Sequence, residues 1–310
     1  MHAMLIVVSV LWGAAAGLLL PRAAYRLSVE PEEAYRDSCE AGHPIIGPVK
    51  GWLGRAGCAT CAAAGGVVMA AGAGGRTDSG AAASPGRAEA GEAALPRTDE
   101  SAPAPGEASP ETDADDAETS TAPAPVLRGA RYVPSVYVTV ITALVCGALA
   151  AATGPRPELA VWLLLAPFAV LLALVDRNVH RLPDQLTLPL ALAAAVLLGI
   201  AALLPADGGS WPTALLGGLA LGACYFVLFL INPNGMGFGD VKLALSLGVV
   251  LGWHGWAVLF VGAFAGFLFG SLYGLGLMLL RRANRKSAIP FGPFMITGAL
   301  LGLVLGALAV

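Results

Sequence analysis

Eight apolar runs, most of them long enough to cross a lipid bilayer, constrain the fold of this chain more than any other feature of its sequence. A transmembrane helix needs about 20 mostly apolar residues to span roughly 30 Å of hydrocarbon. The runs lie near residues 3–20, 134–153, 158–175, 185–204, 212–232, 241–252, 255–280 and 290–309. The sequence therefore predicts an all-α, polytopic integral membrane protein with about eight transmembrane helices, of which the one at 241–252 is short.

Charged residues divide the chain further. They make up only 13% of it, against about 25% in a soluble domain, which excludes a single water-soluble domain. Eleven acids lie between Asp78 and Glu118, in a stretch rich in Ala, Gly, Ser, Thr and Pro that has too little apolar surface to fold. This stretch is expected to be a disordered linker, with an acidic docking tail as the alternative. The predicted division is a first transmembrane helix (1–20), a short cytoplasmic region (21–69), the linker (70–130) and a membrane domain of about seven helices (131–310).

Arginines and lysines predict the orientation, because short loops rich in these residues stay in the cytoplasm. Arg22 and Arg26 follow the first run, and Arg128 and Arg131 precede the second, so the N-terminus is expected outside and residues 21–133 inside. The later inside loops carry Arg177, Arg181, Lys242, Arg281, Arg282, Arg285 and Lys286, whereas the outside loops carry only Arg156. A cleaved signal peptide at residues 1–20 is the alternative to an anchor, but no basic residue precedes this run and two follow it.

Five carboxylates remain in the C-terminal part, and the predicted topology separates them. Glu158 and Asp207 fall in outside loops, where a solvated charge is expected. Asp176, Asp184 and Asp240 fall at the cytoplasmic ends of three different helices, so they could meet in space. Two carboxyl groups close together share one proton, which is how an aspartic dyad activates water.

Each of the three cytoplasmic carboxylates also has a structural interpretation. Asp184 opens the fourth apolar run and is well placed to cap the N-terminus of that helix. Asp176 could be an interfacial charge beside Arg177, and Asp240 could pair with Lys242 or cap the sixth helix. Composition and spacing alone leave these interpretations open beside the dyad.

The local sequences around the carboxylates favour the dyad. Asp240 ends the segment Gly237-Phe238-Gly239-Asp240, which resembles the Gly-x-Gly-Asp signature of membrane aspartic proteases. Asp176, the segment 182–189 and the segment 289–294 also resemble the type IV prepilin leader peptidases, and all these segments follow the order of that family along the chain. By this resemblance Asp176 is the first catalytic aspartate and Asp240 the second, while Asp184 belongs to a neighbouring motif of the family.

The resemblance also indicates what surrounds the dyad. Gly237 and Gly239 have no Cβ, so the backbone there can take φ > 0 and let a peptide substrate approach Asp240 closely. The alternative is an ordinary loop turn. The remaining candidates for the motif or the substrate groove are Lys242, Pro290, Gly292 and Pro293, although the prolines could equally stiffen the entry to the last helix.

The activity implied by the family is cleavage of a short basic leader from type IV pilin-like precursors, with no cofactor required for proteolysis. The resemblance therefore implies a multi-pass endopeptidase of the cell membrane, active at the cytoplasmic face. Its implied partners are pilin-like precursors and the lipid bilayer, with no nucleic acid. A transporter or channel with interfacial carboxylates is the main alternative, although a conduction path usually needs polar groups at mid-depth. An inactive membrane scaffold is the other alternative.

Three cysteines and a histidine in the cytoplasmic region are candidate metal ligands. Relatives in the family carry two Cys-x-x-Cys pairs here, a spacing that suits tetrahedral zinc. This chain has Cys58-x-x-Cys61, but only Cys39, followed by His43, at the first pair. A Cys₃His Zn²⁺ site and a remnant that binds nothing are the two interpretations. The family also implies methyl transfer from S-adenosylmethionine to the mature pilin, an activity associated with this region, which is short here.

Overall fold

The computed structural model describes most of the chain outside its acidic middle. The described residues are 2–29, 33–55, 57–58, 60–61, 135–180, 182–206, 208–233, 235–280 and 290–309, and all of them fall in one compact unit. The predicted linker at 70–130, the basic cluster at 281–286 and Asp207 lie outside them. The predicted division into domains therefore stays a prediction.

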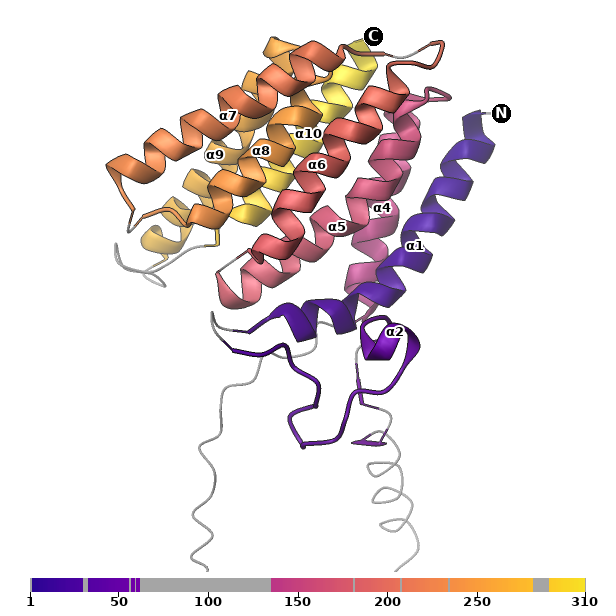
Figure 1. Ribbon diagram of the computed structural model, residues 1–310, viewed down its shortest axis with the longest axis vertical. Helices are drawn as coiled ribbons and strands as arrows, with labels where there is room; N and C mark the ends of the chain where they lie inside the picture. Colours follow the sequence, from indigo (N-terminus) through magenta and orange to yellow (C-terminus); the bar gives the residue numbers. More distant parts are fainter. Residues whose placement is uncertain are drawn as a thin grey trace, which may run out of the picture. The chain divides into compact units, whose positions relative to one another are not determined.

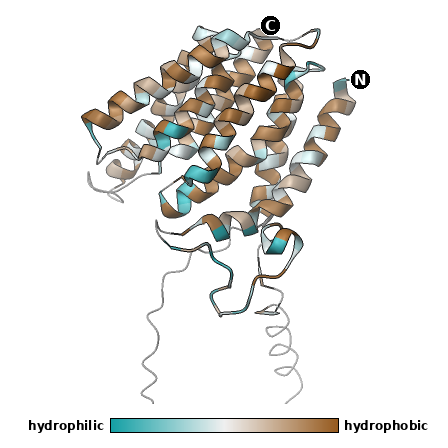
Figure 2. Cartoon of the chain, in the orientation of Figure 1, coloured by the Kyte–Doolittle hydropathy of each residue, from teal (hydrophilic) through white to brown (hydrophobic). Residues whose placement is uncertain are grey.

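The described residues form helices and no strands, which confirms the predicted all-α class. The helices are α1 (His2–Leu27), α2 (Pro48–Gly51), α4 (Ser135–Thr153), α5 (Glu158–Val179), α6 (Asp184–Ala201), α7 (Trp211–Ile231), α8 (Phe238–Gly252), α9 (Trp256–Leu279) and α10 (Gly292–Ala309). Seven of them are long and apolar enough to cross a membrane, and apolar residues cover most of their length (Figure 2). The chain is therefore a polytopic α-helical membrane protein.

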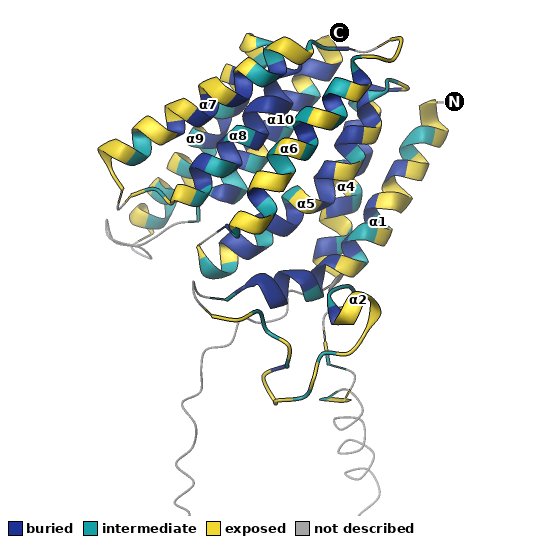
Figure 3. Ribbon diagram, in the orientation of Figure 1, coloured by how far each residue is buried: buried dark blue, intermediate teal, exposed yellow. Residues whose placement is uncertain are grey.

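Helix α8 differs from the eighth span that the sequence predicts. It has 15 residues, which gives a length of about 22 Å, and it is not among the helices long enough to cross a membrane. Most of its side chains are buried (Figure 3), because α6, α7, α9 and α10 pack around it. Small residues permit the closest of these contacts, since a Cβ on Gly248 would stand 2.5 Å from the carbonyl oxygen of Gly217 in α7.

The long helices alternate in direction, which brings particular helix ends together. Both chain termini lie at one end of the bundle, and α2 lies at the other (Figure 1). At the α2 end, α5 and α7 finish and α6, α8 and α10 begin. Helix α1 continues seven residues beyond the predicted run at 3–20 and bends in its second half (Figure 1), where Pro21 lies inside the helix.

The opposite end of the bundle contains a buried ion pair. Glu158 is fully buried, so the expectation of a solvated loop charge is wrong. The reason is its neighbours, because Arg156 lies 3.6 Å from its Oε1 and the backbone N–H of Gly208 donates to the same oxygen at 3.2 Å. Arg156 also donates to the carbonyl oxygen of Ala307 at 2.8 Å. The pair therefore ties the start of α5 to the end of α10 and to the loop before α7.

Candidate active site

Asp176, Asp184 and Asp240 all lie at the α2 end of the bundle, but they differ in burial. Asp176, in the last turns of α5, is 4% exposed, and Asp240, in the first turn of α8, is 7% exposed. The side chain of Asp184, the first residue of α6, is 63% exposed. The structure thus separates two buried carboxyl groups from one that faces solvent.

The carboxyl group of Asp176 is held by the start of α10. The backbone N–H of Gly292 donates to Asp176 Oδ2 at 2.9 Å. A Cβ at position 292 would stand 2.8 Å from the same oxygen, so only glycine allows the backbone to come this close. Asp176 is buried, so it is not the interfacial charge of the alternative interpretation. Its hydrogen bond with the backbone of Gly292 also explains why a glycine occupies this position of the predicted groove segment.

Asp240 lies close enough to Asp176 for the two carboxyl charges to interact. Its backbone N–H donates to the carbonyl oxygen of Gly237 at 3.0 Å, which starts α8. Tyr225 of α7 is buried near Asp240, and its ring centroid lies 6.3 Å from that of Phe291. The sequence analysis did not single out Tyr225, because no motif contains it and its proximity arises only when α7 packs on α8.

The two glycines of the Gly-x-Gly-Asp segment do not use the positive φ that glycine permits. Gly237 has φ −72° and precedes α8, and neither it nor Gly239 is among the glycines with positive φ. Gly239 instead permits close packing, because a Cβ there would stand 3.0 Å from the Cβ of Leu182. The glycine at 239 therefore brings the loop before α6 against the first turn of α8.

Asp184 forms an ion pair and does not cap its helix. Pro183 is the N-cap residue of α6, and no side chain makes a capping hydrogen bond there. Asp184 Oδ2 lies 2.5 Å from Lys242 Nζ. Lys242 therefore pairs with Asp184 and not with Asp240, which was one of the alternative interpretations. Lys242 Nζ lies 4.8 Å from the ring centroid of Phe238 as well. The ion pair joins the first turns of α6 and α8 beside Asp240.

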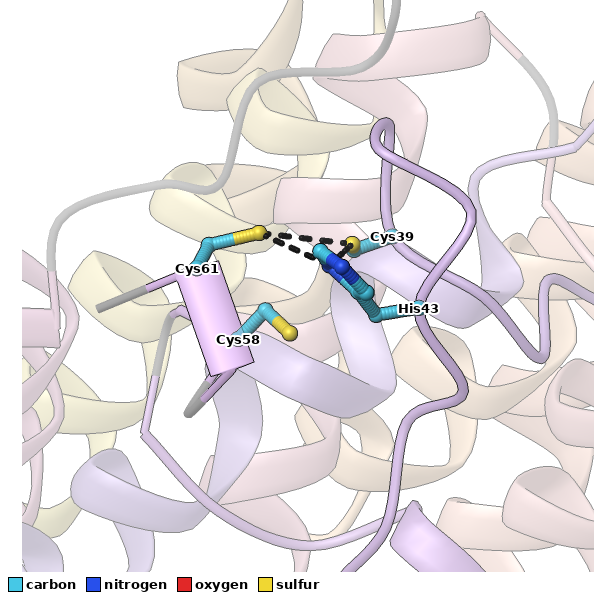
Figure 4. A group of neighbouring side chains, drawn as sticks. All are labelled: Cys39, His43, Cys58 and Cys61. Atoms are coloured by element: carbon cyan, nitrogen blue, oxygen red, sulfur yellow. Dashed lines mark hydrogen bonds between the residues drawn. The ribbon is translucent and has the colours of Figure 1, made fainter. Parts of the chain in front are cut away.

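The four candidate metal ligands in the segment 33–61 lie together (Figure 4). The ligand atoms of Cys39, His43, Cys58 and Cys61 all lie within 4.8 Å of one another. Cys39 Sγ is 3.7 Å from Cys61 Sγ and 3.6 Å from His43 Nδ1, and His43 Nδ1 is 3.2 Å from Cys61 Sγ. Sulfur ligands about 2.3 Å from a tetrahedral zinc ion lie roughly 3.8 Å apart, so this donor set fits a metal ion of that kind.

The thiols of this cluster are not equivalent. A hydrogen bond from the backbone of Cys61 lowers the pKa of the Cys58 thiol to about 6, as is usual in a Cys-x-x-Cys segment. The hydrogen bond between the side chains of Cys61 and Cys39 raises the pKa of the Cys61 thiol to about 11. The cluster therefore contains a thiol that readily becomes the thiolate that binds metals.

Two arginines hold the segment 46–55 on the end of α1. Arg22 donates to the carbonyl oxygens of Ile46 at 2.9 Å and Arg55 at 3.1 Å. Arg26 donates to the carbonyl oxygen of Lys50 at 2.8 Å, and its guanidinium lies 4.5 Å from the ring centroid of Trp52. In the sequence these arginines indicate only orientation. The structure shows that they also fold the segment between the two parts of the Cys/His cluster.

Fold and site together define a class of protein, a polytopic α-helical membrane protein with two interacting, buried aspartates, one in the last turns of α5 and one in the first turn of α8. Residues 163–279 match the model of the type IV leader peptidase family. This confirms, for that segment, the resemblance that the motifs indicated. The matched segment includes Asp176, Asp184 and Asp240, whereas Gly292 and the Cys/His cluster lie outside it.

Curated relatives agree with the family match. The chain is 35% identical over 170 residues to a prepilin leader peptidase/N-methyltransferase of Aeromonas hydrophila, covering 54% of this chain and 57% of that protein. Proteins of the same name match from Pseudomonas aeruginosa, at 30% identity with 57% and 59% covered, and from Bacillus subtilis, at 33% with 44% and 52% covered. The matches thus span little more than half the length of these relatives. No solved structure matches the chain.

Proposed function

We propose that this protein is a prepilin leader peptidase, a membrane aspartic endopeptidase that removes the leader from pilin-like precursors. The observation that carries the proposal is the pair of buried, interacting carboxyl groups of Asp176 and Asp240. Buried acids within a membrane bundle are costly and usually functional. The family match over residues 163–279 and the names of the relatives support the same reaction.

In the proposed mechanism the two carboxyl groups share one proton. The ionised carboxylate removes a proton from a water molecule as the water oxygen attacks the scissile carbonyl carbon. The protonated partner donates a hydrogen bond to the carbonyl oxygen, and a proton then passes to the leaving amine as the C–N bond breaks. The hydrogen bond from Gly292 holds one oxygen of Asp176 and so orients its other oxygen.

The proposed location is the cytoplasmic face of the cell membrane, with the N-terminus outside. The support for this orientation is Arg22 and Arg26, which lie at the end of the bundle that contains the two aspartates. A precursor with a basic leader in the cytoplasm and an apolar helix in the membrane would present its cleavage site at this depth. The site is therefore suited to a peptide bond at the membrane interface.

We also propose that Cys39, His43, Cys58 and Cys61 bind one zinc ion. The distances among the donor atoms support this assignment, as does the preference of zinc for thiolate and imidazole ligands. A bound zinc ion would cross-link the two halves of the cytoplasmic region and takes no part in the proposed proteolysis. The relatives' names also include N-methyltransferase. Transfer of label from S-adenosylmethionine to the cleaved product would test for that activity here.

The proposed function is tested by expressing this protein with a pilin-like precursor from the same organism in a host that lacks a leader peptidase. We expect a shortened product whose new N-terminus, read by sequencing, lies at the junction between the basic leader and the apolar helix. A precursor that stays full length, with the protein present in the membrane, would contradict the proposal. Ion flux through the purified protein in vesicles, without cleavage, would instead support a channel.

A further inference from the structure

A narrow apolar cavity of about 290 Å³ lies among α4, α5, α6, α8 and α10. Its lining is apolar except for Arg177, Ser246 and Thr297. The Ser246 hydroxyl donates to the carbonyl oxygen of Thr187, and that of Thr297 donates to the carbonyl oxygen of Pro293. Since a buried water molecule needs two to four polar partners, the interior of this cavity suits an apolar occupant.

The shape of the cavity limits that occupant to a single hydrocarbon chain. The lining includes Trp162 and Arg177 of α5, which are separated by about 22 Å along the helix axis. An apolar cavity of about 150 Å³ holds one benzene ring, so the volume here suits on the order of a dozen carbon atoms. An α-helix, about 10 Å or more in diameter, is too wide to enter.

One end of the cavity opens to the surroundings and the other is closed. Ile141, Arg177 and Thr297 line the end near Asp176, and all three are exposed. The lining residues nearer the opposite end of the bundle, Leu149 and Trp162 among them, are buried. A chain would therefore enter at the end where the guanidinium of Arg177 lies.

The guanidinium of Arg177 is available to a ligand. Among the described residues, no carboxylate forms an ion pair with Arg177, and its side chain makes no hydrogen bond. A guanidinium binds phosphate through two parallel hydrogen bonds, and basic pockets between transmembrane helices bind anionic headgroups. A phospholipid supplies both an acyl chain for the cavity and a phosphate for its mouth.

We propose that this cavity holds one acyl chain of an anionic phospholipid whose phosphate binds Arg177. An anionic lipid is favoured over a zwitterionic one because its headgroup brings no ammonium group to the arginine. The lipid lies between α4 and α10 beside the last turn of α5, so it supports the helix that carries Asp176. This site is independent of the proposed peptidase activity.

Photo-crosslinking of the full chain in detergent tests the proposal. The probes are phosphatidylglycerol and phosphatidylcholine with the same acyl chains, one of which carries a diazirine, and labelled peptides are mapped by mass spectrometry. We expect phosphatidylglycerol to label the cavity face of α5 severalfold more than phosphatidylcholine does. The exposed residues Leu144 of α4 and Phe260 of α9, which lie outside the cavity lining, should be labelled equally by both probes.

Two variants and their controls distinguish the contribution of the Arg177 charge to lipid binding from that of the cavity volume. Arg177→Gln should reduce cavity labelling by phosphatidylglycerol to the level of phosphatidylcholine, whereas Arg55→Gln, at an exposed arginine of the cytoplasmic region, should not. Ala169→Phe, which fills the cavity, should abolish cavity labelling, whereas Ala148→Phe on an exposed face of α4 should not. Equal labelling by both lipids, or unchanged labelling of Ala169→Phe, would overturn the proposal. Displacement of the lipid by an apolar helical peptide would overturn it too.

Discussion

At the scale of single residues, the site depends on a glycine outside the Gly-x-Gly-Asp signature. Gly292 donates its backbone N–H to Asp176 across 116 positions of sequence. Nothing in the sequence around either residue specifies this contact, because it forms only when the start of α10 packs against the end of α5. Motif reasoning therefore identified Gly292 as a groove candidate but could not assign its partner.

Gly292→Ala tests this contact. The added Cβ would stand 2.8 Å from Asp176 Oδ2, so the carboxyl group or the start of α10 must shift. A displacement of about 1 Å at a reacting group can cost roughly 10²-fold in rate, and we expect a loss of this order in leader cleavage by the purified protein. Gly276→Ala is the matched control, because a Cβ there meets no atom within 4 Å. Full activity in Gly292→Ala would show that the contact is dispensable.

At the scale of secondary-structure elements, helix ends far apart in sequence are joined by a few polar contacts. Lys242 and Asp184 join α6 to α8 at one end of the bundle, and Arg156 and Glu158 join α5 to α10 at the other. In the first pair Asp184 is exposed and Lys242 is mostly buried, with side-chain exposures of 63% and 14%, so solvent screens this pair only in part. The pair at Glu158 is different, because removal of one partner leaves an uncompensated buried charge.

Arg156→Met is therefore expected to destabilise the bundle. Loss of one member of a buried ion pair costs about 3 kcal/mol or more, so the midpoint of thermal unfolding in detergent should fall clearly. The double variant Arg156→Met with Glu158→Gln should recover much of this loss, because the second change removes the unpaired charge. Arg55→Met, at an exposed arginine, serves as the control and should melt like the wild type. A double variant less stable than Arg156→Met would contradict this account.

At the scale of the whole molecule, the sequence predicted the fold class and the end of the bundle at which the important acids gather. Hydropathy located the long helices, and the alternation of basic loops placed Asp176, Asp184 and Asp240 at one end. What the sequence could not predict was the burial of each acid. Glu158 is buried because Arg156 and Gly208 surround it, and Asp184 is exposed although it lies in a family motif. Such differences depend on neighbours supplied by distant helices.

The Cys/His cluster formed by Cys39, His43, Cys58 and Cys61 provides a prediction at the same scale. If its four ligands hold zinc, the purified protein should contain about one zinc ion per chain, measured by elemental mass spectrometry. Cys61→Ser should remove most of this zinc, because Cys61 Sγ lies near both Cys39 Sγ and His43 Nδ1. Cys224→Ser on α7, outside the cluster, is the control and should retain it. Equal zinc contents in the two variants would contradict the assignment.

The central claim is that Asp176 and Asp240 form the catalytic pair, and its most direct measurement is the rate of leader cleavage by purified variants. Asp176→Asn and Asp240→Asn should each lose at least about 10³-fold in rate, as expected when one member of a cooperating catalytic set is removed. Asp184→Asn should retain substantial activity, because it breaks an ion pair with Lys242 and leaves the two buried carboxyl groups in place. All three variants should elute and melt like the wild type. Near-normal cleavage by Asp176→Asn or Asp240→Asn would contradict the account.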